Sequence, residues 1–261
     1  MHSIIIPHRN RNRYLTQCLQ SIGGAYRAVR PDPTIEVVVV DNQSVHCPRG
    51  WAGSGTPTIR VVNCRHRAAD GAFNKPAVLN TGIAEARGDI LTFLDCDAIV
   101  GPKWLQGIER LYDDLTITRL CYRVRKLPAE RLMELERSQK PNVLLGDWFS
   151  HYDDYPRSHE GYILPGLNGE AGLVFGNSQF SIRRDVLGDL RFDESYSGRG
   201  FEDISFIRTI YKKLGPNYKA EILTDPDHAM FHIEQTEAEK TQWGPPELTA
   251  ANRERYFADD N

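Results

Sequence analysis

The stretch Asp89-Ile90-Leu91-Thr92-Phe93-Leu94-Asp95-Cys96-Asp97 ends a short apolar run in two carboxylates. A run of this length and composition predicts a buried β-strand. In an open α/β sheet, ligands collect beyond the carboxyl ends of the strands, so we expect Asp95 and Asp97 to face a cleft. Two carboxylates at this spacing can approach one hard divalent cation, which prefers oxygen ligands. A strand capped by two solvated acids is the simpler alternative, and the rest of the chain has to decide between them.

Length and charge narrow the class of protein. The chain has 261 residues, which suits one large α/β domain or two small ones. Its 32 basic and 35 acidic residues give a net charge of -3, so no basic excess indicates nucleic acid and no polybasic run indicates a membrane surface. No apolar stretch is long enough to cross a membrane, and the first strand begins at Ser3, which leaves no room for a signal peptide.

The cysteines indicate a reducing compartment. The chain has five of them, without a Cys-x-x-Cys pair. An odd number at irregular spacing argues against a disulfide framework and against a thiolate zinc site. We therefore expect a cytoplasmic protein without a transmembrane segment, for which any contact with a membrane would be peripheral.

Strands and helices alternate through the first hundred residues. The first strand is expected to stop at Pro7 and the first helix at Gly23-Gly24. The expected strands are 4–6, 35–40, 58–63 and 90–94, and the expected helices are 15–22 and 75–86. This alternation predicts an α/β fold with a doubly wound, mostly parallel sheet flanked by helices in a single domain.

The later part of the chain is less regular. A helix at 102–115, a strand at 119–126 and a helix at 129–137 are followed by a long connection at 139–172 that is rich in aromatic residues, glycine and proline. Long connections of this kind are often functional. A strand at 180–182, a helix at 203–214 and a polar tail from 234 to 261 complete the expected order.

Polar groups follow several of the expected strands. Pro7-His8-Arg9-Asn10-Arg11 and Asp41 stand at strand ends, where arginines can pair with phosphate and a carboxylate can accept a hydrogen bond from a base or ribose. A solvated loop would explain the arginines equally well. Phe73-Asn74-Lys75 precedes a helix, whose N-terminus favours an anion. Ordinary capping explains Asn74 but not Lys75.

An acid pair and a histidine pair complete the candidate groups. Glu202-Asp203 follows a glycine-rich bend, and one of the two acids could abstract a proton from a hydroxyl nucleophile. Favourable interaction with the helix dipole is the competing explanation. His228 and His232 are four residues apart, as in some zinc sites. We favour one of them completing a site begun by Asp97, with mixed nitrogen and oxygen ligands that suit manganese.

In this order the segments resemble the GT-A fold inverting glycosyltransferases of family 2. The similarity is greatest to the β-1,4-galactosyltransferase-like group and to bacterial chondroitin-polymerase-type enzymes, and it extends from about residue 3 to residue 235. The segments that carry it are Ile5-Ile6-Pro7-His8-Arg9-Asn10-Arg11, Phe73-Asn74-Lys75 with Leu79-Asn80-Thr81-Gly82, Asp95-Cys96-Asp97, Phe175-Gly176-Asn177 and Gly200-Phe201-Glu202-Asp203.

The resemblance implies a role for each matching position. Asp97 and His232 would bind the metal together with Asp95, and His228 is the fallback ligand. Asp203 would be the catalytic base, with Glu202 binding the acceptor sugar. The residues implied to bind the nucleotide are Pro7, His8, Arg9, Arg11, Asp41, Phe73, Lys75, Asn80, Asp95 and Cys96. The glycosyltransferase domain would span 1–233, with a nucleotide-binding half up to about residue 100 and an acceptor-binding half at 101–233.

Several positions depart from the galactosyltransferase pattern. His8 stands where phenylalanine is usual, Asn177 replaces the second glycine of a pair, and Arg199 takes the place of a mobile tryptophan. Phe201 replaces a glycine and Ile204 an acid. These changes surround the acceptor and donor-sugar pockets, so the resemblance leaves the donor sugar open.

The expected activity is transfer of a galactose or N-acetylhexosamine type of sugar from a UDP-sugar to a hydroxyl of a glycan or glycolipid, with inversion and with Mn²⁺ or Mg²⁺ as cofactor. Two alternatives stay open. A nucleotidyltransferase acting on sugar phosphates would usually carry a glycine-rich loop where Pro7-His8-Arg9 stands. A non-catalytic sugar-nucleotide-binding protein would not need the acid pair at 202–203.

Overall fold

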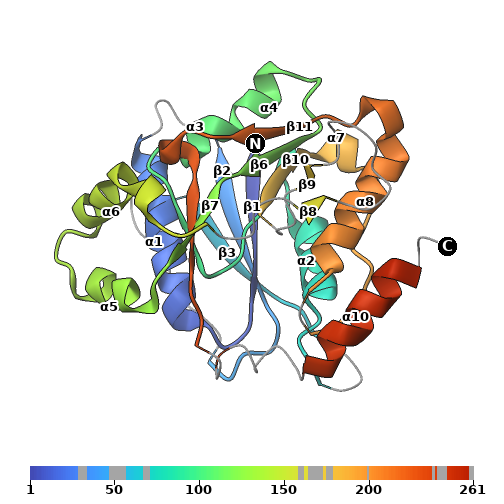
Figure 1. Ribbon diagram of the computed structural model, residues 1–261, viewed down its shortest axis with the longest axis horizontal. Coiled ribbons are helices and arrows are strands. Elements are labelled where there is room, and N and C mark those ends of the chain that lie inside the picture. Colours follow the sequence, from blue (N-terminus) through green and yellow to red (C-terminus); the bar gives the residue numbers. More distant parts are fainter. Residues whose placement is uncertain are drawn as a thin grey trace.

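A mixed seven-stranded sheet forms the centre of the computed structural model, with helices on both faces (Figure 1). The structure describes residues 1–28, 34–46, 57–66, 71–157, 162–163, 173–174, 179–198, 200–236, 239 and 246–258. The strand order is β11-β6-β10-β4-β1-β2-β3. These strands are β1 (His2–His8), β2 (Ile35–Asp41), β3 (Thr58–Asn63), β4 (Ile90–Phe93), β6 (Arg119–Tyr122), β10 (Phe180–Arg183) and β11 (Ala220–Leu223).

The sheet is parallel from β4 to β3 and between β6 and β11, whereas β10 runs antiparallel to both of its neighbours. Every residue of β1 and β2 is buried, as expected for parallel strands covered on two faces. The predicted α/β sheet flanked by helices is therefore confirmed, with β10 making it a mixed sheet.

Helices cover the sheet on two sides. They are α1 (Asn12–Ala28), α2 (Lys75–Glu85), α3 (Trp104–Ile108), α4 (Arg110–Asp113), α5 (Ala129–Arg137), α6 (Pro141–Ser150), α7 (Arg184–Leu187), α8 (Glu202–Leu214) and α10 (Pro246–Ala258). Because side chains alternate along a strand, Ile4 and Ile6 pack under α1 and α3, while Ile5 packs under α2 and α8. Within the described residues, no helix is long and apolar enough to span a membrane.

A second sheet brings distant parts of the chain together. It has the order β5-β12-β7, with β5 (Ala98–Val100), β12 (Met230–Ile233) and β7 (Val124–Leu127). In the antiparallel β5–β12 ladder His232 lies opposite Ala98, and the N–H of Ile233 donates to the carbonyl of Asp97 at 2.9 Å. Backbone pairing thus fixes a histidine near the C-terminal end beside the Asp95–Asp97 segment. A separate two-stranded ribbon joins β8 (Tyr162–Ile163) to β9 (Leu173–Val174).

The prediction that the first strand stops at Pro7 is wrong. Strand β1 continues through His8, and Pro7 lies opposite Val40 of β2. On its other side β1 pairs with β4 only as far as Ile5. Proline lacks a backbone N–H, and it is tolerated here because the pairing on that side has already ended.

The prediction that Gly23-Gly24 ends the first helix is also wrong. Helix α1 runs on to Ala28. A Cβ at Gly24 would lie 3.2 Å from Oδ1 of Asn142 in α6, so this glycine allows close packing between two helices. The proposed helix at 102–115 is likewise divided into α3 and α4, and the strand at 119–126 is divided into β6 and β7, which belong to different sheets.

Part of the expected connection at 139–172 is helical. Helix α6 and a short 3-10 helix, η1 (Tyr152–Asp154), form most of its first half. Trp148, Phe149 and Tyr152 are buried in a cluster with Phe231 of β12. These aromatic residues therefore form a third hydrophobic core beside the two cores that cover the main sheet.

The polar segment after residue 234 contains α10, which packs on the domain beside α8 (Figure 1). Tyr256 belongs to the same hydrophobic cluster as Phe206 and Ile207 of α8. Residues 246–258 of the predicted polar tail therefore form a helix that packs on the domain.

Candidate active site

Three side chains meet at the tip of β4. Asp95, Asp97 and His232 each offer one ligand atom, and these atoms all lie within 4.8 Å of one another. Nε2 of His232 is 3.5 Å from Oδ1 of Asp97. Two carboxylates and one imidazole form a mixed oxygen and nitrogen set that fits Mn²⁺ or Mg²⁺. The expectation that a late histidine lies beside Asp97 is met by His232, and His228 is not part of the cluster.

Arg11 balances the charge of this cluster. Its Nη1 donates to Oδ2 of Asp97 at 3.0 Å, and its Nη2 donates to Oε1 of Gln235 at 2.9 Å. The side-chain amide of Gln235 also donates to Oδ2 of Asp97. Arg11 is 5% exposed. A residue predicted to hold the nucleotide is thus, in this structure, an ion-pair partner of a candidate metal ligand.

Lys75 connects the metal cluster to the acid pair. Its Nζ lies 2.7 Å from Oδ1 of Asp95 and 3.6 Å from Oε1 of Glu202. Lys75 occupies the first position of α2 because Asn74 caps that helix, accepting the N–H of Ala77 at 2.9 Å. Burial alone would lower the pKa of Lys75, but the carboxylates of Asp95, Glu202 and Asp203 raise it above its usual value. The lysine is therefore a fixed positive charge between the two groups.

Glu202 and Asp203 open helix α8. Burial, together with the neighbouring charge of Asp203, raises the pKa of Glu202 to about 7, although Lys75 acts in the opposite direction. Burial also raises the pKa of Asp203. Glu202 is 7% exposed, whereas Asp203 is half-buried. Asp203 is thus the more accessible of the two acids.

The described charges of this region do not balance. Among the described residues, the four carboxylates of Asp95, Asp97, Glu202 and Asp203 outnumber Arg11 and Lys75, the two cations in ion pairs with them, although the raised pKa values of the two acids of α8 reduce their negative charge. Buried charges are costly unless they are paired. A divalent cation held by Asp95, Asp97 and His232 would offset this excess of negative charge.

His8 and Asp41 form a closed network under the site. The N–H of Arg11 donates to Nε2 of His8, so the ring proton is on Nδ1, which donates to Oδ1 of Asp41 at 2.8 Å. Ser44 also donates to Asp41 through its hydroxyl and its backbone N–H. Burial opposes ionisation, yet these hydrogen bonds lower the pKa of Asp41. Asp41 is 1% exposed, so the carboxylate predicted to meet the base or ribose has its partners inside the protein.

The other residues predicted to bind the nucleotide have different surroundings. Pro7, Phe73 and Cys96 are buried, and burial raises the pKa of the Cys96 thiol. Nη1 of Arg9 donates to the carbonyl of Gly71 at 3.2 Å. The side chain of Asn80 has a structural role, since it exchanges hydrogen bonds with the backbone of Phe192. Their contacts with a nucleotide stay predictions. Phe175-Gly176-Asn177 and Arg199 lie outside the described residues.

Sequence reasoning missed two polar residues at the site. Gln235 contacts both Arg11 and Asp97, and its position three residues after His232 is the signal that could have indicated it. Asn252 of α10 donates to the carbonyls of Ser197 and Gly200, in the bend that precedes the acid pair. No motif marks Asn252, because its contacts depend on how α10 packs.

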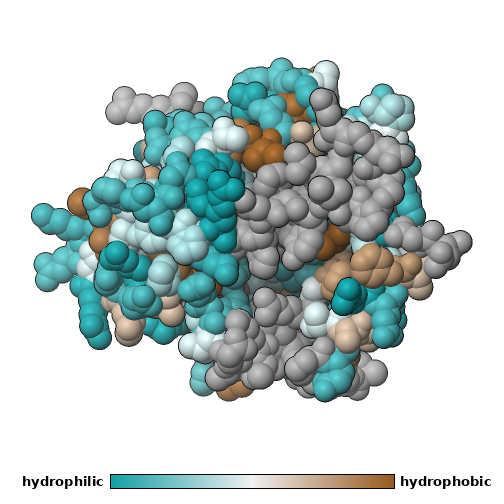
Figure 2. Space-filling view, viewed as in Figure 1, coloured by the Kyte–Doolittle hydropathy of each residue, from teal (hydrophilic) through white to brown (hydrophobic). Residues whose placement is uncertain are grey.

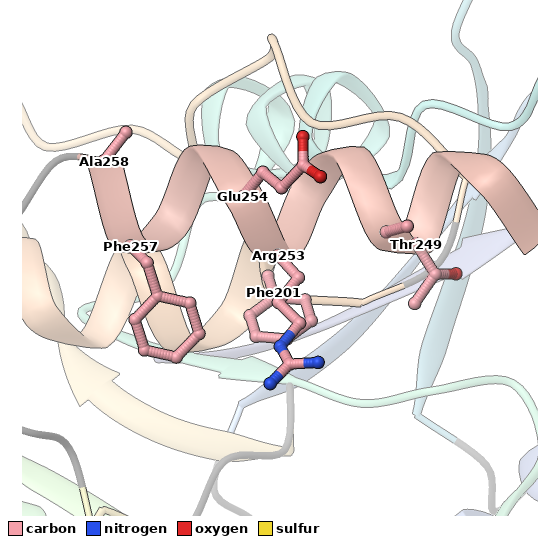
Figure 3. A pocket seen from close by; sticks show the side chains of 7 residues that line it. Phe201, Thr249, Arg253, Glu254, Phe257 and Ala258 are labelled. Atoms are coloured by element: carbon pink, nitrogen blue, oxygen red, sulfur yellow. The ribbon is translucent and has the colours of Figure 1, made fainter.

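An open groove of about 890 Å³ lies beside the acid pair, between Phe201 and α10. Arg253 and Phe257 line it together with Phe201 (Figure 3), and the Arg253 guanidinium lies 5.9 Å from the centre of the Phe257 ring. Phe257 is 42% exposed. Most of the described surface in Figure 2 is hydrophilic, with hydrophobic side chains showing near the C-terminal end of α10. The groove therefore offers aromatic rings, the cation of Arg253 and the carboxylate of Glu254 to a ligand.

Comparison with known proteins agrees with this geometry. Residues 3–126 match the family model Glycosyl transferase family 2. The structure is similar to residues 1–349 of S. aureus TarS, with a TM-score of 0.56 and 18% identity over 98% of this chain and 72% of that one. The chain has the GT-A glycosyltransferase fold. Among curated protein sequences, none matches it.

Two further GT-A structures were solved with a nucleotide and Mn²⁺. Glucosyl-3-phosphoglycerate synthase from Mycobacterium tuberculosis, bound to UDP, Mn²⁺ and glucosyl-3-phosphoglycerate, has a TM-score of 0.53 and 16% identity over 99% of this chain and 77% of that one. The mannosyltransferase PcManGT from Pyrobaculum calidifontis, bound to GDP-Man and Mn²⁺, has a TM-score of 0.54 and 17% identity over 98% and 69%. The narrower resemblance to β-1,4-galactosyltransferases and chondroitin-polymerase-type enzymes stays a prediction.

Proposed function

We propose that the protein is a metal-dependent inverting glycosyltransferase. It would transfer a sugar of the galactose or N-acetylhexosamine type from a UDP-sugar to a hydroxyl of a glycan or glycolipid. The observation that carries this proposal is the cluster of Asp95, Asp97 and His232, joined through Lys75 to the acids Glu202 and Asp203. One site thus combines a cation-binding set with carboxylates able to accept a proton.

The comparisons support a nucleotide-sugar donor. S. aureus TarS has been solved with UDP-GlcNAc, the mycobacterial synthase with UDP and Mn²⁺, and the Pyrobaculum enzyme with GDP-Man and Mn²⁺. We favour uridine because of the resemblance of the sequence motifs. The departures at His8, Phe201 and Ile204 leave the choice between galactose and an N-acetylhexosamine to experiment.

In the proposed mechanism, the metal ligands on one side of Lys75 and the acids Glu202 and Asp203 on the other have different roles. When bound, the divalent cation supplies positive charge that stabilises the diphosphate leaving group. Arg11 and Lys75 hold the acids in place and add positive charge beside the phosphates. Asp203 accepts the proton of the acceptor hydroxyl as that oxygen attacks the anomeric carbon, and Glu202 accepts a hydrogen bond from the acceptor sugar. Attack opposite the leaving group inverts the anomeric configuration.

The groove at α10 suits the acceptor. It begins at Phe201, which directly precedes Glu202, and two phenylalanine rings with a guanidinium provide flat faces for sugar rings. A Phe257→Ala variant should raise the acceptor KM several-fold, because a stacking face worth roughly 1 kcal/mol is lost. Its affinity for UDP with Mn²⁺ should equal that of the wild type. An unchanged acceptor KM would place the acceptor elsewhere.

A product assay tests the function itself. The protein is incubated with single UDP-sugars, Mn²⁺ and a panel of glycan and glycolipid acceptors, and UDP release is followed together with the anomeric configuration of the product by NMR. The proposal predicts UDP as the released nucleotide and an inverted linkage. A parallel incubation contains UTP and a sugar phosphate instead. Release of pyrophosphate in that incubation would indicate a nucleotidyltransferase. Tight UDP-sugar binding without turnover on any acceptor, and without donor hydrolysis, would indicate a binding protein.

A further inference from the structure

The bend that carries the acid pair has an unusual backbone. Gly198 and Gly200 have φ values of 72° and 93°, and Phe201 has a φ of 72°. A left-handed conformation is easy for glycine but unfavourable for a residue with a Cβ such as phenylalanine. Such conformations persist where surrounding contacts hold them, and they concentrate at functional sites. The contacts that hold this bend therefore determine where Glu202 and Asp203 lie.

Two contacts hold the bend from opposite sides. The N–H of Gly198 donates to the carbonyl of Phe73 at 3.0 Å, next to Lys75. From the other side, Nδ2 of Asn252 donates to the carbonyl of Ser197 at 2.8 Å and to that of Gly200 at 3.1 Å. Asn252 is 5% exposed. One buried amide thus ties together both ends of the left-handed turn.

Helix α10 is itself fixed to α8, the helix that begins with the acid pair. Nη1 of Arg208 donates to the carbonyl of Tyr256 at 3.0 Å, and the Arg208 guanidinium lies 3.8 Å from the centre of the Tyr256 ring. The Tyr256 ring in turn packs on Phe201, with 5.6 Å between ring centres. Arg208, Tyr256 and Asn252 therefore place α10 and the bend in one rigid arrangement.

We propose that Asn252 is a positioning residue for the acid pair, and that α10 acts through it as the clamp of the catalytic bend. The proposal rests on the catalytic role proposed for Glu202 and Asp203. A helix that served only as a cover would be anchored by apolar side chains such as Tyr256. Asn252 instead directs two N–H groups at two carbonyls of a bend whose conformation is unfavourable for Phe201.

The test compares Asn252→Ala with Glu247→Gln, an exposed position on the same helix. Asn252→Ala should lower kcat at least about tenfold, since a misplacement of 1 Å can cost ~10²-fold. Its Kd for UDP with Mn²⁺ should stay within about twofold of the wild type, and Glu247→Gln should leave both values unchanged. Asn252→Gln, which keeps the amide donors, should recover part of kcat.

Two further measurements separate positioning from general damage. In Asn252→Ala, amide hydrogen exchange at Gly198 should become faster while exchange in β1 is unchanged. In an Asp203→Asn background, Asn252→Ala should add almost no further loss of kcat, because both act through one group. A kcat within twofold of the wild type, a parallel loss of UDP affinity, or full additivity would overturn the proposal. If the wild type transfers no sugar, the proposed function is wrong. The role of Asn252 in holding the bend is then tested by hydrogen exchange alone, and unchanged exchange at Gly198 in Asn252→Ala would contradict it.

Discussion

The two sides of the site are held in different ways. The metal side is fixed by the backbone, since His232 and Asp97 are placed by the β5–β12 ladder. The acid side follows a bend in which Gly198, Gly200 and Phe201 are left-handed. One backbone hydrogen bond from Gly198 and the side chain of Asn252, which is 52 and 55 positions away from the carbonyls that it binds, hold this bend. The ladder consists of several backbone hydrogen bonds, which a side-chain substitution does not remove. The amide of Asn252 is a single side chain, which one substitution removes. If the proposed function is correct, the position of the metal ligands depends on the backbone of the sheet, and the position of the base depends on one side chain of α10.

Lys75 is the link between the two sides, and removing it should give the largest effect on stability. In Lys75→Met the half-buried carboxylate of Asp95 and the buried carboxylate of Glu202 lose their partner, which typically costs about 3 kcal/mol or more in the free energy of unfolding. Urea denaturation at pH 7.5 without metal measures this. The matched control is Lys213→Met, whose pair with Asp189 is exposed and should contribute little to the free energy of unfolding. Equal losses in both variants would show that Lys75 does not join the two sides.

Asp203 should separate catalysis from binding. Removing a general base typically lowers the rate by ~10²–10⁴-fold, so Asp203→Asn should transfer sugar at least ~10²-fold more slowly. Its affinity for UDP with Mn²⁺ should match that of the wild type, because the metal side is intact. Asp189→Asn, at an exposed acid, should keep full activity. Near-normal turnover in Asp203→Asn would move the base to another residue.

The stability of the central sheet, which supports Asp95 and Asp97, should depend on pH through His2. It is buried in β1 and its Nε2 lies 2.8 Å from Oγ1 of Thr92, which also bonds Ser181 of β10. Burial lowers the pKa of His2 from 6.5 to about 3, so between these values the unfolded chain binds a proton that the folded protein does not. Stability is therefore complete above pH 6.5 and is lost as the pH falls, by about 2 kcal/mol at pH 5 for this group.

The measurement is the difference in unfolding free energy between pH 7 and pH 5. His2→Gln should lose roughly 2 kcal/mol less than the wild type over this range. His151→Gln, at an exposed histidine, should behave like the wild type. An acid sensitivity that is the same in all three proteins would mean that the stability of the central sheet does not depend on a neutral His2.

The sequence allowed prediction of the metal side better than of the acid side. Asp95 and Asp97 were recognisable because a buried strand ends at them, and the motif order indicated His232. Local patterns also gave the exact bounds of β3 and α5. The polar segment after residue 234 gave no such signal, since α10 mixes polar and apolar residues without a clear helical period. Its partners, such as Arg208, are known only once the chain has folded.

Errors in the predicted fold have a common physical cause. Pro7 and Gly23-Gly24 were expected to end elements because of their local conformational preferences. In the structure the neighbours decide, because β4 no longer pairs beside Pro7 and α6 packs closely on Gly24. Tertiary contacts therefore override local preference at these positions, and they also determine the position of Asn252.

The most direct test of the central claim is calorimetric titration of UDP into the wild type and Asp97→Asn, each with Mn²⁺ and with EDTA. The amide has nearly the same shape as the carboxylate, but it removes the charge of one proposed ligand. We predict that Mn²⁺ strengthens UDP binding to the wild type by at least about tenfold, and that this enhancement is lost in Asp97→Asn. An enhancement of equal size in Asp97→Asn, or wild-type binding that EDTA leaves unchanged, would contradict a metal-dependent nucleotide site at Asp95, Asp97 and His232.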